Sequence, residues 1–164
     1  MNKPKMSIGE QLIKQPNSRN CFVCGKENAF GLKLEFYESR PGEVIVETII
    51  PKQYQGYPGV VHGGIVAAML DEVTGRVHMG GNPPRFMFTA RLNIRYRKNV
   101  PVGQSLRIVG HAGKSKERSA LATAQVFGAD GDLLAEADAL LVNVPEEITS
   151  QVDLQALGWK VYES

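Results

Sequence analysis

The sequence is poor in cysteine and in long apolar segments, and each absence excludes a class of protein. Its longest stretch without polar side chains covers residues 63–70, far fewer than the roughly 20 apolar residues of a membrane-spanning helix. Residues 1–16 contain lysines but no apolar segment after them, unlike a secretory signal. Two cysteines, Cys21 and Cys24, are too few for a disulfide scaffold. We therefore expect reduced thiols, a cytoplasmic location and no membrane partner.

An excess of charge of one sign is also lacking, because 19 basic and 17 acidic residues leave a net charge of +2. So small a net charge does not indicate nucleic-acid binding, and no nucleic-acid partner is expected. The charges are nevertheless unevenly distributed. Nine basic residues and one acidic residue lie between Arg85 and Arg118, whereas eight acidic residues and one basic residue follow from Asp130 onward. The middle of the chain is therefore basic.

The composition, 43% hydrophobic and 22% charged, is typical of a folded domain, and 164 residues suffice for a single core. Alternating apolar and polar residues predict β-strands on both sides of one long apolar segment. An Asp-Gly pair at Asp130-Gly131 predicts a hairpin turn before the last strand. The six expected strands cover residues 32–37, 43–50, 86–97, 105–113, 120–127 and 133–144.

The apolar segment at residues 64–79 has no period of two and predicts a helix of about four turns. Its first two turns are apolar on almost all sides, which predicts a central helix wrapped by the sheet. Six strands and one helix indicate an α+β fold, and the free edges of such a sheet favour pairing with a second copy. Short helices are expected around Ile8 to Lys14 and near Leu154, and Trp159 is expected to be a packing residue.

Two acidic residues follow the apolar part of this helix. Asp71 comes after six consecutive apolar residues, where an ionised carboxylate is costly unless it is paired or used. Asp71 has two explanations. It has a catalytic role, or its side chain faces solvent or caps a backbone group. Glu72 points about 100° away around the helix, so the two residues do not form one carboxylate pair.

His62-Gly63-Gly64 stands where this helix begins. Glycines there allow a ligand to approach free backbone N–H groups at the positive end of the helix dipole, as in an oxyanion hole; a tight turn is the alternative explanation. The helical rise from Gly63 to Asp71 is about 12 Å, too long for both to contact one carbonyl carbon. If the two cooperate, Asp71 must come from the partner subunit.

His62-Gly63-Gly64, an apolar helix and an acid nine positions after the histidine together resemble hotdog-fold acyl-CoA thioesterases. The resemblance is to the branch of phenylacetate-pathway thioesterases and human thioesterase-superfamily members. It continues through residues 88–96 and 101–103, and residues 21–32 resemble a lead-in found in a subset of these proteins. It implies a hotdog domain at residues 20–145, with an N-terminal extension at 1–19 and a C-terminal tail at 146–164.

The resemblance implies hydrolysis of a small, medium or aromatic acyl-CoA by a homodimer or a dimer of dimers. Asp71 matches the catalytic carboxylate, as nucleophile or general base, and Gly63 matches the residue whose backbone N–H polarises the thioester carbonyl. Thr89 matches a hydroxyl that orients the water or the acid. Gln55 is the counterpart of an Asn or Gln that many relatives place six or seven residues before the histidine. His62 is assigned a positioning role, although hotdog dehydratases use a histidine as catalytic base.

The chemistry of the residues agrees with this assignment. A carboxylate can activate water and a helix N-terminus can bind an oxyanion, so no metal and no cofactor beyond the coenzyme A of the substrate are expected. Gly64 adds a second candidate N–H for substrate binding. Basic residues at strand ends are candidates for binding the phosphates of coenzyme A, although each one also fits a solvated surface. These residues are Arg97, Lys98, Lys114, Lys116 and Arg118.

Other functions stay open. Cys21 and Cys24 form half of a zinc site, and the other ligands would have to come from three histidines or from carboxylates. A redox dithiol is less favoured because no strand precedes the pair and no helix clearly follows it. A non-catalytic acyl-CoA-binding hotdog module and an enoyl thioester hydratase or dehydratase are the alternatives to a thioesterase.

Overall fold

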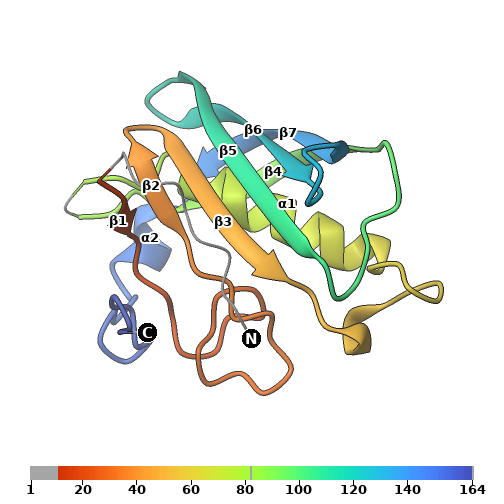
Figure 1. Cartoon of the computed structure of the whole chain (residues 1–164). Helices are drawn as coiled ribbons and strands as arrows, with labels where there is room; N and C mark the ends of the chain where they lie inside the picture. Colours follow the sequence, from red (N-terminus) through yellow and green to blue (C-terminus); the bar gives the residue numbers. More distant parts are fainter. Residues whose placement is uncertain (1–10, 82, 164) are drawn as a thin grey trace.

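The structure, a computed structural model, describes residues 11–81 and 83–163. One curved antiparallel sheet wraps around a long helix, α1 (Gly63–Arg76), as Figure 1 shows. The sheet order is β1-β2-β3-β5-β6-β7-β4. The predicted α+β class and hotdog arrangement are confirmed. The strands of the described ranges are β1 (Ile13–Lys14), β2 (Tyr37–Arg40), β3 (Glu43–Ile49), β4 (Met87–Tyr96), β5 (Ser105–Ser115), β6 (Ser119–Phe127) and β7 (Leu133–Asn143).

The minor elements differ from the expectation. Ile13–Lys14 is strand β1, paired with Tyr37 and Glu38, instead of the end of a helix; residues 8–10 of that expected helix lie outside the described residues. The tail helix is α2 (Glu146–Thr149), not a helix near Leu154, and a short 3-10 helix, η1 (Lys52–Tyr54), precedes α1. No helix of the described ranges is long and apolar enough to cross a bilayer.

The first expected strand, residues 32–37, joins the sheet only from Tyr37 onward. Its alternation is real, since Leu34 and Phe36 are buried. However, Lys33 has a φ of 53°, which breaks the regular extended backbone. The N-terminal segment also binds carbonyl groups of this expected strand: Gln15 N–H donates to Phe36 O, and Asn17 Nδ2 donates to Leu34 O. Residues 32–36 therefore alternate in burial as a strand does, but they do not pair with a neighbouring strand of the sheet.

Helix α1 is held in the concave side of the sheet by its apolar side chains. Val66, Met69, Leu70 and Val73 follow the i, i+3, i+4, i+7 spacing of one helix face, and each is at most 1% exposed. Gly110 on β5 allows the close approach, since a Cβ there would lie 2.5 Å from Val73 Cγ1. The central helix therefore sits in the core as predicted, with its first residues, Gly63 and Gly64, exposed.

The two end segments of the described chain pack together beside the C-terminal end of α1. Arg76, the last helical residue, donates from a terminal nitrogen to Pro16 O at 2.7 Å. Its guanidinium lies 3.8 Å from the centre of the Phe36 ring and 5.4 Å from that of Trp159. Trp159 also meets Phe86 edge-on. Trp159 is thus a packing residue, as expected.

Strand β4 forms one edge of the sheet, because β7 is its only neighbour among the described strands. It is ten residues long and largely exposed, with Phe88 50% and Tyr96 54% accessible. Long exposed edges of this kind pair readily with another chain.

Candidate functional site

Asp71 and Thr89 meet between α1 and β4. The Thr89 hydroxyl donates to Asp71 Oδ1 at 2.6 Å. The carboxylate is partly buried, and no group of the described residues binds its other oxygen, Oδ2. The hydroxyl therefore fixes the plane of the carboxylate and leaves one oxygen available to a water molecule. The structure brings these two predicted residues together.

A β-bulge in β4 is what turns Thr89 toward the helix. Thr89 pairs with Leu141 and Arg91 with Leu140, so Ala90 is an extra residue between them. Before the bulge the odd-numbered position 89 faces α1. After the bulge the even-numbered Tyr96 faces α1, since the Tyr96 hydroxyl donates to Gly63 O at 2.7 Å. Without the extra residue, strict alternation would put Thr89 and Tyr96 on opposite faces of the strand.

The N-terminus of α1 leaves one backbone N–H unused. His62 is the N-cap, and its Nδ1 accepts from Gly64 N–H at 2.9 Å. The His62 carbonyl accepts from Ile65 and Val66. No acceptor among the described residues takes the Gly63 N–H. Gly63 is therefore available to an oxyanion, whereas the predicted Gly64 N–H is already engaged by His62, whose ring holds the first turn.

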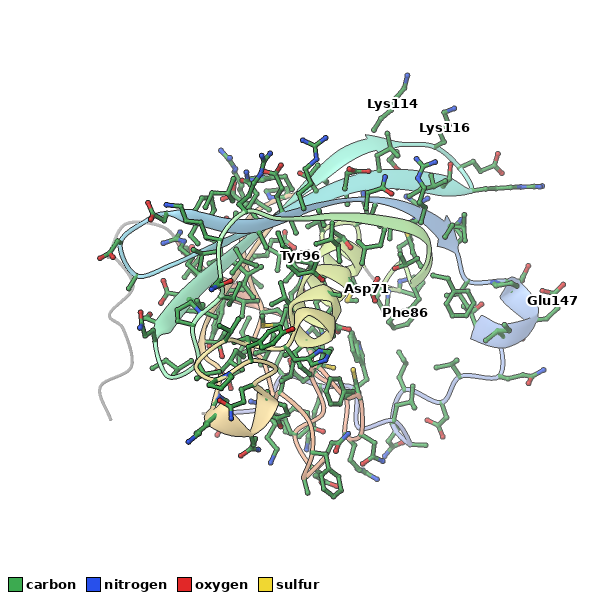
Figure 2. All side chains as sticks on the ribbon, turned by 90° about the vertical axis from the view of Figure 1, so that its right-hand side faces the viewer. Asp71, Phe86, Tyr96, Lys114, Lys116 and Glu147 are labelled. Carbon is green, nitrogen blue, oxygen red and sulfur yellow. The ribbon has the colours of Figure 1, made fainter. Side chains whose placement is uncertain are left out.

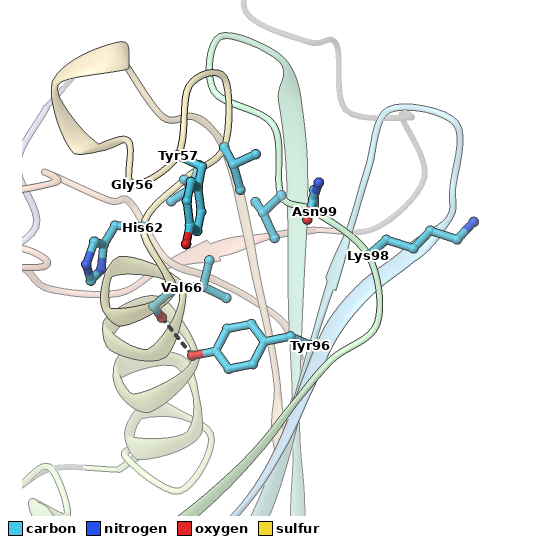
Figure 3. A pocket seen from close by; sticks show the side chains of 11 residues that line it. Gly56, Tyr57, His62, Val66, Tyr96, Lys98 and Asn99 are labelled. Atoms are coloured by element: carbon cyan, nitrogen blue, oxygen red, sulfur yellow. Dashed lines mark hydrogen bonds between the residues drawn. The ribbon is translucent and has the colours of Figure 1, made fainter.

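A cavity of about 420 Å³ lies at this helix end (Figure 3). Its lining includes Tyr57, His62, Gly63, Tyr96 and Lys98. Figure 3 shows the Tyr96 phenol reaching from β4 to the first turn of the helix. The sequence did not single out Tyr96, because nothing local says that a strand residue meets a helix end 33 positions away in the chain.

Gln55 does not line this cavity. Its Oε1 accepts from Gly59 N–H at 3.2 Å, within the loop that leads to α1. The side chain thus shapes the loop, and the structure does not bring its carbonyl oxygen to the Gly63 N–H.

The five basic candidates fall into two groups. Arg97 pairs with Glu136 and Lys98 with Asp132, and Lys98 also lines the cavity at the helix N-terminus. Lys114 and Lys116, with Arg118, belong to the exposed hairpin between β5 and β6, and Figure 2 shows the two lysines projecting far from Tyr96. One chain therefore does not gather all five around one cavity.

A second cavity, of about 230 Å³, adjoins the Asp71–Thr89 pair. Cys21, Cys24 and Glu72 contribute to its wall, as do Asp71 and Thr89. Cys21 Sγ lies 4.0 Å from Glu72 Oε2. The sequence does not connect Glu72 with the cysteine pair, because 51 residues separate Cys21 from Glu72.

The acidic groups of this second cavity influence one another. Burial raises the pKa of Glu72, although the Arg76 charge opposes that rise. The hydrogen bond from Cys21 lowers the pKa of Cys24 to about 5. The same hydrogen bond, followed by burial and the Glu72 charge, raises the pKa of Cys21. The two thiols are therefore chemically unequal.

Comparison with known proteins finds similarity to thioesterases. The family model described as "Thioesterase superfamily" matches residues 58–135. Acyl-coenzyme A thioesterase THEM4 of Bos taurus is 27% identical over 149 residues, which is 90% of this chain and 59% of that protein. The protein of that name from Xenopus laevis is 31% identical over 93 residues, 55% of this chain and 40% of that protein. This chain thus spans between 40% and 59% of the length of these curated relatives.

Solved structures share the fold. A crystal structure of a thioesterase superfamily protein matches with a TM-score of 0.70 and 30% identity, over 76% of this chain and 60% of that one. A Streptococcus mutans protein bound to acetyl-CoA matches with a TM-score of 0.62 and 22% identity, over 68% of this chain and 88% of that one. At that lower identity the likeness shows the fold alone.

Proposed function

We propose that this hotdog-fold chain, whose residues 58–135 match the thioesterase superfamily model, hydrolyses acyl-CoA thioesters to a free acid and coenzyme A. The observation that carries the proposal is the 2.6 Å hydrogen bond from Thr89 to Asp71. It holds a carboxylate at the second cavity, with an Oδ2 that no other group of the described residues binds. The names of the relatives support the same activity.

Asp71 acts as the general base in this mechanism. Its Oδ2 takes a proton from a water molecule, whose oxygen attacks the thioester carbonyl carbon. The carbonyl oxygen becomes an oxyanion, which the Gly63 N–H stabilises at the positive end of the helix dipole. The tetrahedral intermediate then expels the coenzyme A thiolate, which takes up a proton. Direct attack by Asp71, through an acyl-enzyme anhydride, is the alternative use of the same carboxylate.

Two chains are needed to complete such a site. Gly63 and Asp71 lie on the same helix, about 12 Å apart along its axis. Thr89 marks the Asp71 end of β4, and Tyr96 marks the Gly63 end. Antiparallel pairing of the free edge of β4 with a second copy, with Thr89 beside the partner's Tyr96, brings Asp71 toward the partner's Gly63. A two-fold dimer of this kind forms two equivalent sites, and two dimers could associate further.

This dimer also gives the basic hairpin a role. Arg85, just before β4, donates to Lys116 O at 2.9 Å, so the hairpin lies at the Thr89 end of the strand. Antiparallel pairing carries that end toward the partner's Gly63. Lys114, Lys116 and Arg118 of one chain could then bind coenzyme A phosphates at the cavity that contains Lys98 of the other chain. Phe86 and Met87 in the second cavity offer apolar contacts for the acyl group.

A thiol-release assay over acyl-CoAs of varied chain length and aromaticity tests the proposal, with Asp71→Asn as the control. We expect release by the wild-type chain and its loss in the variant, with circular dichroism and oligomeric state unchanged. Unaltered hydrolysis by Asp71→Asn would contradict the mechanism. Saturable acyl-CoA binding without release would identify a non-catalytic module instead, and a change in enoyl absorbance would identify a hydratase or dehydratase.

A further inference from the structure

Cys21, Cys24 and Glu72 converge on one point beside α1. Their two sulfurs and one carboxylate oxygen all lie within 4.8 Å of one another. A zinc ion with tetrahedral ligands sets about 3.8 Å between two sulfurs and about 3.6 Å between a sulfur and an oxygen. The 4.0 Å from Cys21 Sγ to Glu72 Oε2 is close to such an edge. Small side-chain movements therefore suffice to place all three around one ion.

The loop that carries the two cysteines is shaped around the Cys21 sulfur. The backbone N–H groups of Val23 and Cys24 both point at Cys21 Sγ, at 3.3 and 3.5 Å. Gly25 closes the turn with a hydrogen bond to Cys21 O at 2.8 Å, and a side chain at position 25 would overlap that carbonyl. Backbone donors aimed at a sulfur stabilise the thiolate that a metal requires.

Glu72 is oriented toward the cysteines by a second residue. Arg76 Nε donates to Glu72 Oε1 at 2.9 Å, which leaves Oε2 on the side of Cys21. The Arg76 side chain is 1% exposed and is fixed by its bond to Pro16 O and its stacking on Phe36. Hydrogen-bonded carboxylates of this kind are typical of metal ligands.

The charges balance when a divalent ion is present. Two thiolates and one carboxylate carry three negative charges, whereas Arg76 supplies one positive charge. A divalent cation brings the sum to zero, which lowers the cost of placing these groups in a partly buried site. Thiolate ligands select zinc over magnesium or calcium.

We propose that Cys21, Cys24 and Glu72 bind a zinc ion that ties the N-terminal segment to α1. The fourth position faces the 230 Å³ cavity that Asp71 and Thr89 also line, so water completes the coordination. The sequence offered the cysteine pair as half of a zinc site, with histidines or carboxylates as the open choice for the other ligands; the fold brings Glu72 to the pair. The site does not depend on thioester hydrolysis.

Metal analysis of the full chain, produced with zinc in the medium and purified under reducing conditions without chelator, tests this site. We expect stoichiometric zinc by mass spectrometry. Replacement of the zinc by Co²⁺ should give the thiolate-to-cobalt charge-transfer absorption of a tetrahedral site. Cys21→Ser, Cys24→Ser and Glu72→Gln should each lower the zinc affinity more than about 10-fold.

Asp71→Asn is the matched control, because Asp71 lines the same cavity but is not one of the three ligands. This variant should keep the zinc. A wild-type chain that binds neither zinc nor Co²⁺ after reduction overturns the proposal, and this outcome does not depend on the folding of any variant. A zinc content that is unchanged in the double cysteine variant overturns it as well. Because the readout is bound metal, an inactive chain with zinc would refute only the proposed hydrolysis.

Discussion

A single backbone N–H at Gly63 carries the stabilisation of the oxyanion in the proposed mechanism. Gly63 is the first residue of α1, after the N-cap His62. The first helical position has no intrahelical acceptor for its N–H, so this group can serve a ligand without cost to the helix. Gly64, the second candidate N–H for substrate binding, differs because His62 Nδ1 already accepts its N–H.

Gly63→Pro removes this N–H while it preserves the helix. Proline is favoured at the first helical position, and His62 already has an extended backbone, with φ −55° and ψ 135°, that tolerates a following proline. We expect kcat to fall about 100- to 1000-fold with little change in Tm. Gly63→Ala keeps the N–H, and its Cβ would lie an ordinary 3.6 Å from the Tyr96 hydroxyl, so this control should stay active. Equal activity of the two variants would show that the N–H is not used.

At the scale of elements, two irregularities of the sheet position the site. The bulge at Ala90 lets Thr89 and Tyr96 both face α1. Gly110 on β5 lets the helix approach the sheet. The sequence predicted both strands by their alternation, because alternation reflects which side of a strand is buried. It did not predict the bulge, since one extra residue leaves the overall apolar pattern of residues 86–97 almost unchanged.

Deletion of Ala90 should therefore inactivate the chain without unfolding it. Without Ala90, the residues on one side of the deletion must exchange the two faces of the strand. Leu92 and Ile94 pack against the core and should keep their face, so Thr89 should turn away from Asp71. Kinetics and a thermal melt of the deletion variant check this. Ala90→Ser keeps the bulge and should keep the activity. A deletion variant with wild-type kcat would mean that Thr89 does not need the bulge.

Gly110→Ala should destabilise the fold by about 1–3 kcal/mol, because its Cβ would overlap Val73 and Val77 of the helix. Gly75→Ala is the matched control: it lies in α1, nothing stands within 4 Å of its added Cβ, and it should stabilise the fold by about 0.5–1 kcal/mol. Urea unfolding of both variants measures the difference. The packing of α1 on β5 would be in doubt if Gly110→Ala were as stable as the wild type.

Across the whole molecule, the sequence predicted the features that depend on neighbouring residues. It did not predict those that depend on contacts between segments far apart in the chain. The central helix and the strands after it follow from periods of two and of about 3.6 residues, which are local properties. Strand β1, the stacking of Arg76 on Trp159 and the contact of Cys21 with Glu72 depend on segments far apart in the sequence. No local pattern encodes such contacts, so the second cavity could not be predicted.

The attachment of the N-terminal segment should weaken in acid. Burial alone would raise the pKa of Glu35, but Lys26 and Lys14, at 2.6 and 3.1 Å, outweigh it and lower the pKa to about 2. A carboxyl group whose pKa is lower in the folded state than in the unfolded chain stabilises the fold at pH values above its pKa in the unfolded chain. That stabilisation is lost as the pH falls from about 5 to about 2. Glu35→Gln should flatten this part of the curve of unfolding free energy against pH; an unchanged slope would contradict the assignment.

Mixing two inactive variants shows whether one active site needs Asp71 of one chain and Gly63 of another. Asp71→Asn and Gly63→Pro are each expected to be inactive alone. After subunit exchange, each mixed dimer contains one site with both native residues, so random mixing should restore about a quarter of the wild-type thioesterase activity. Mixed dimers that form and yet release no thiol would contradict the account.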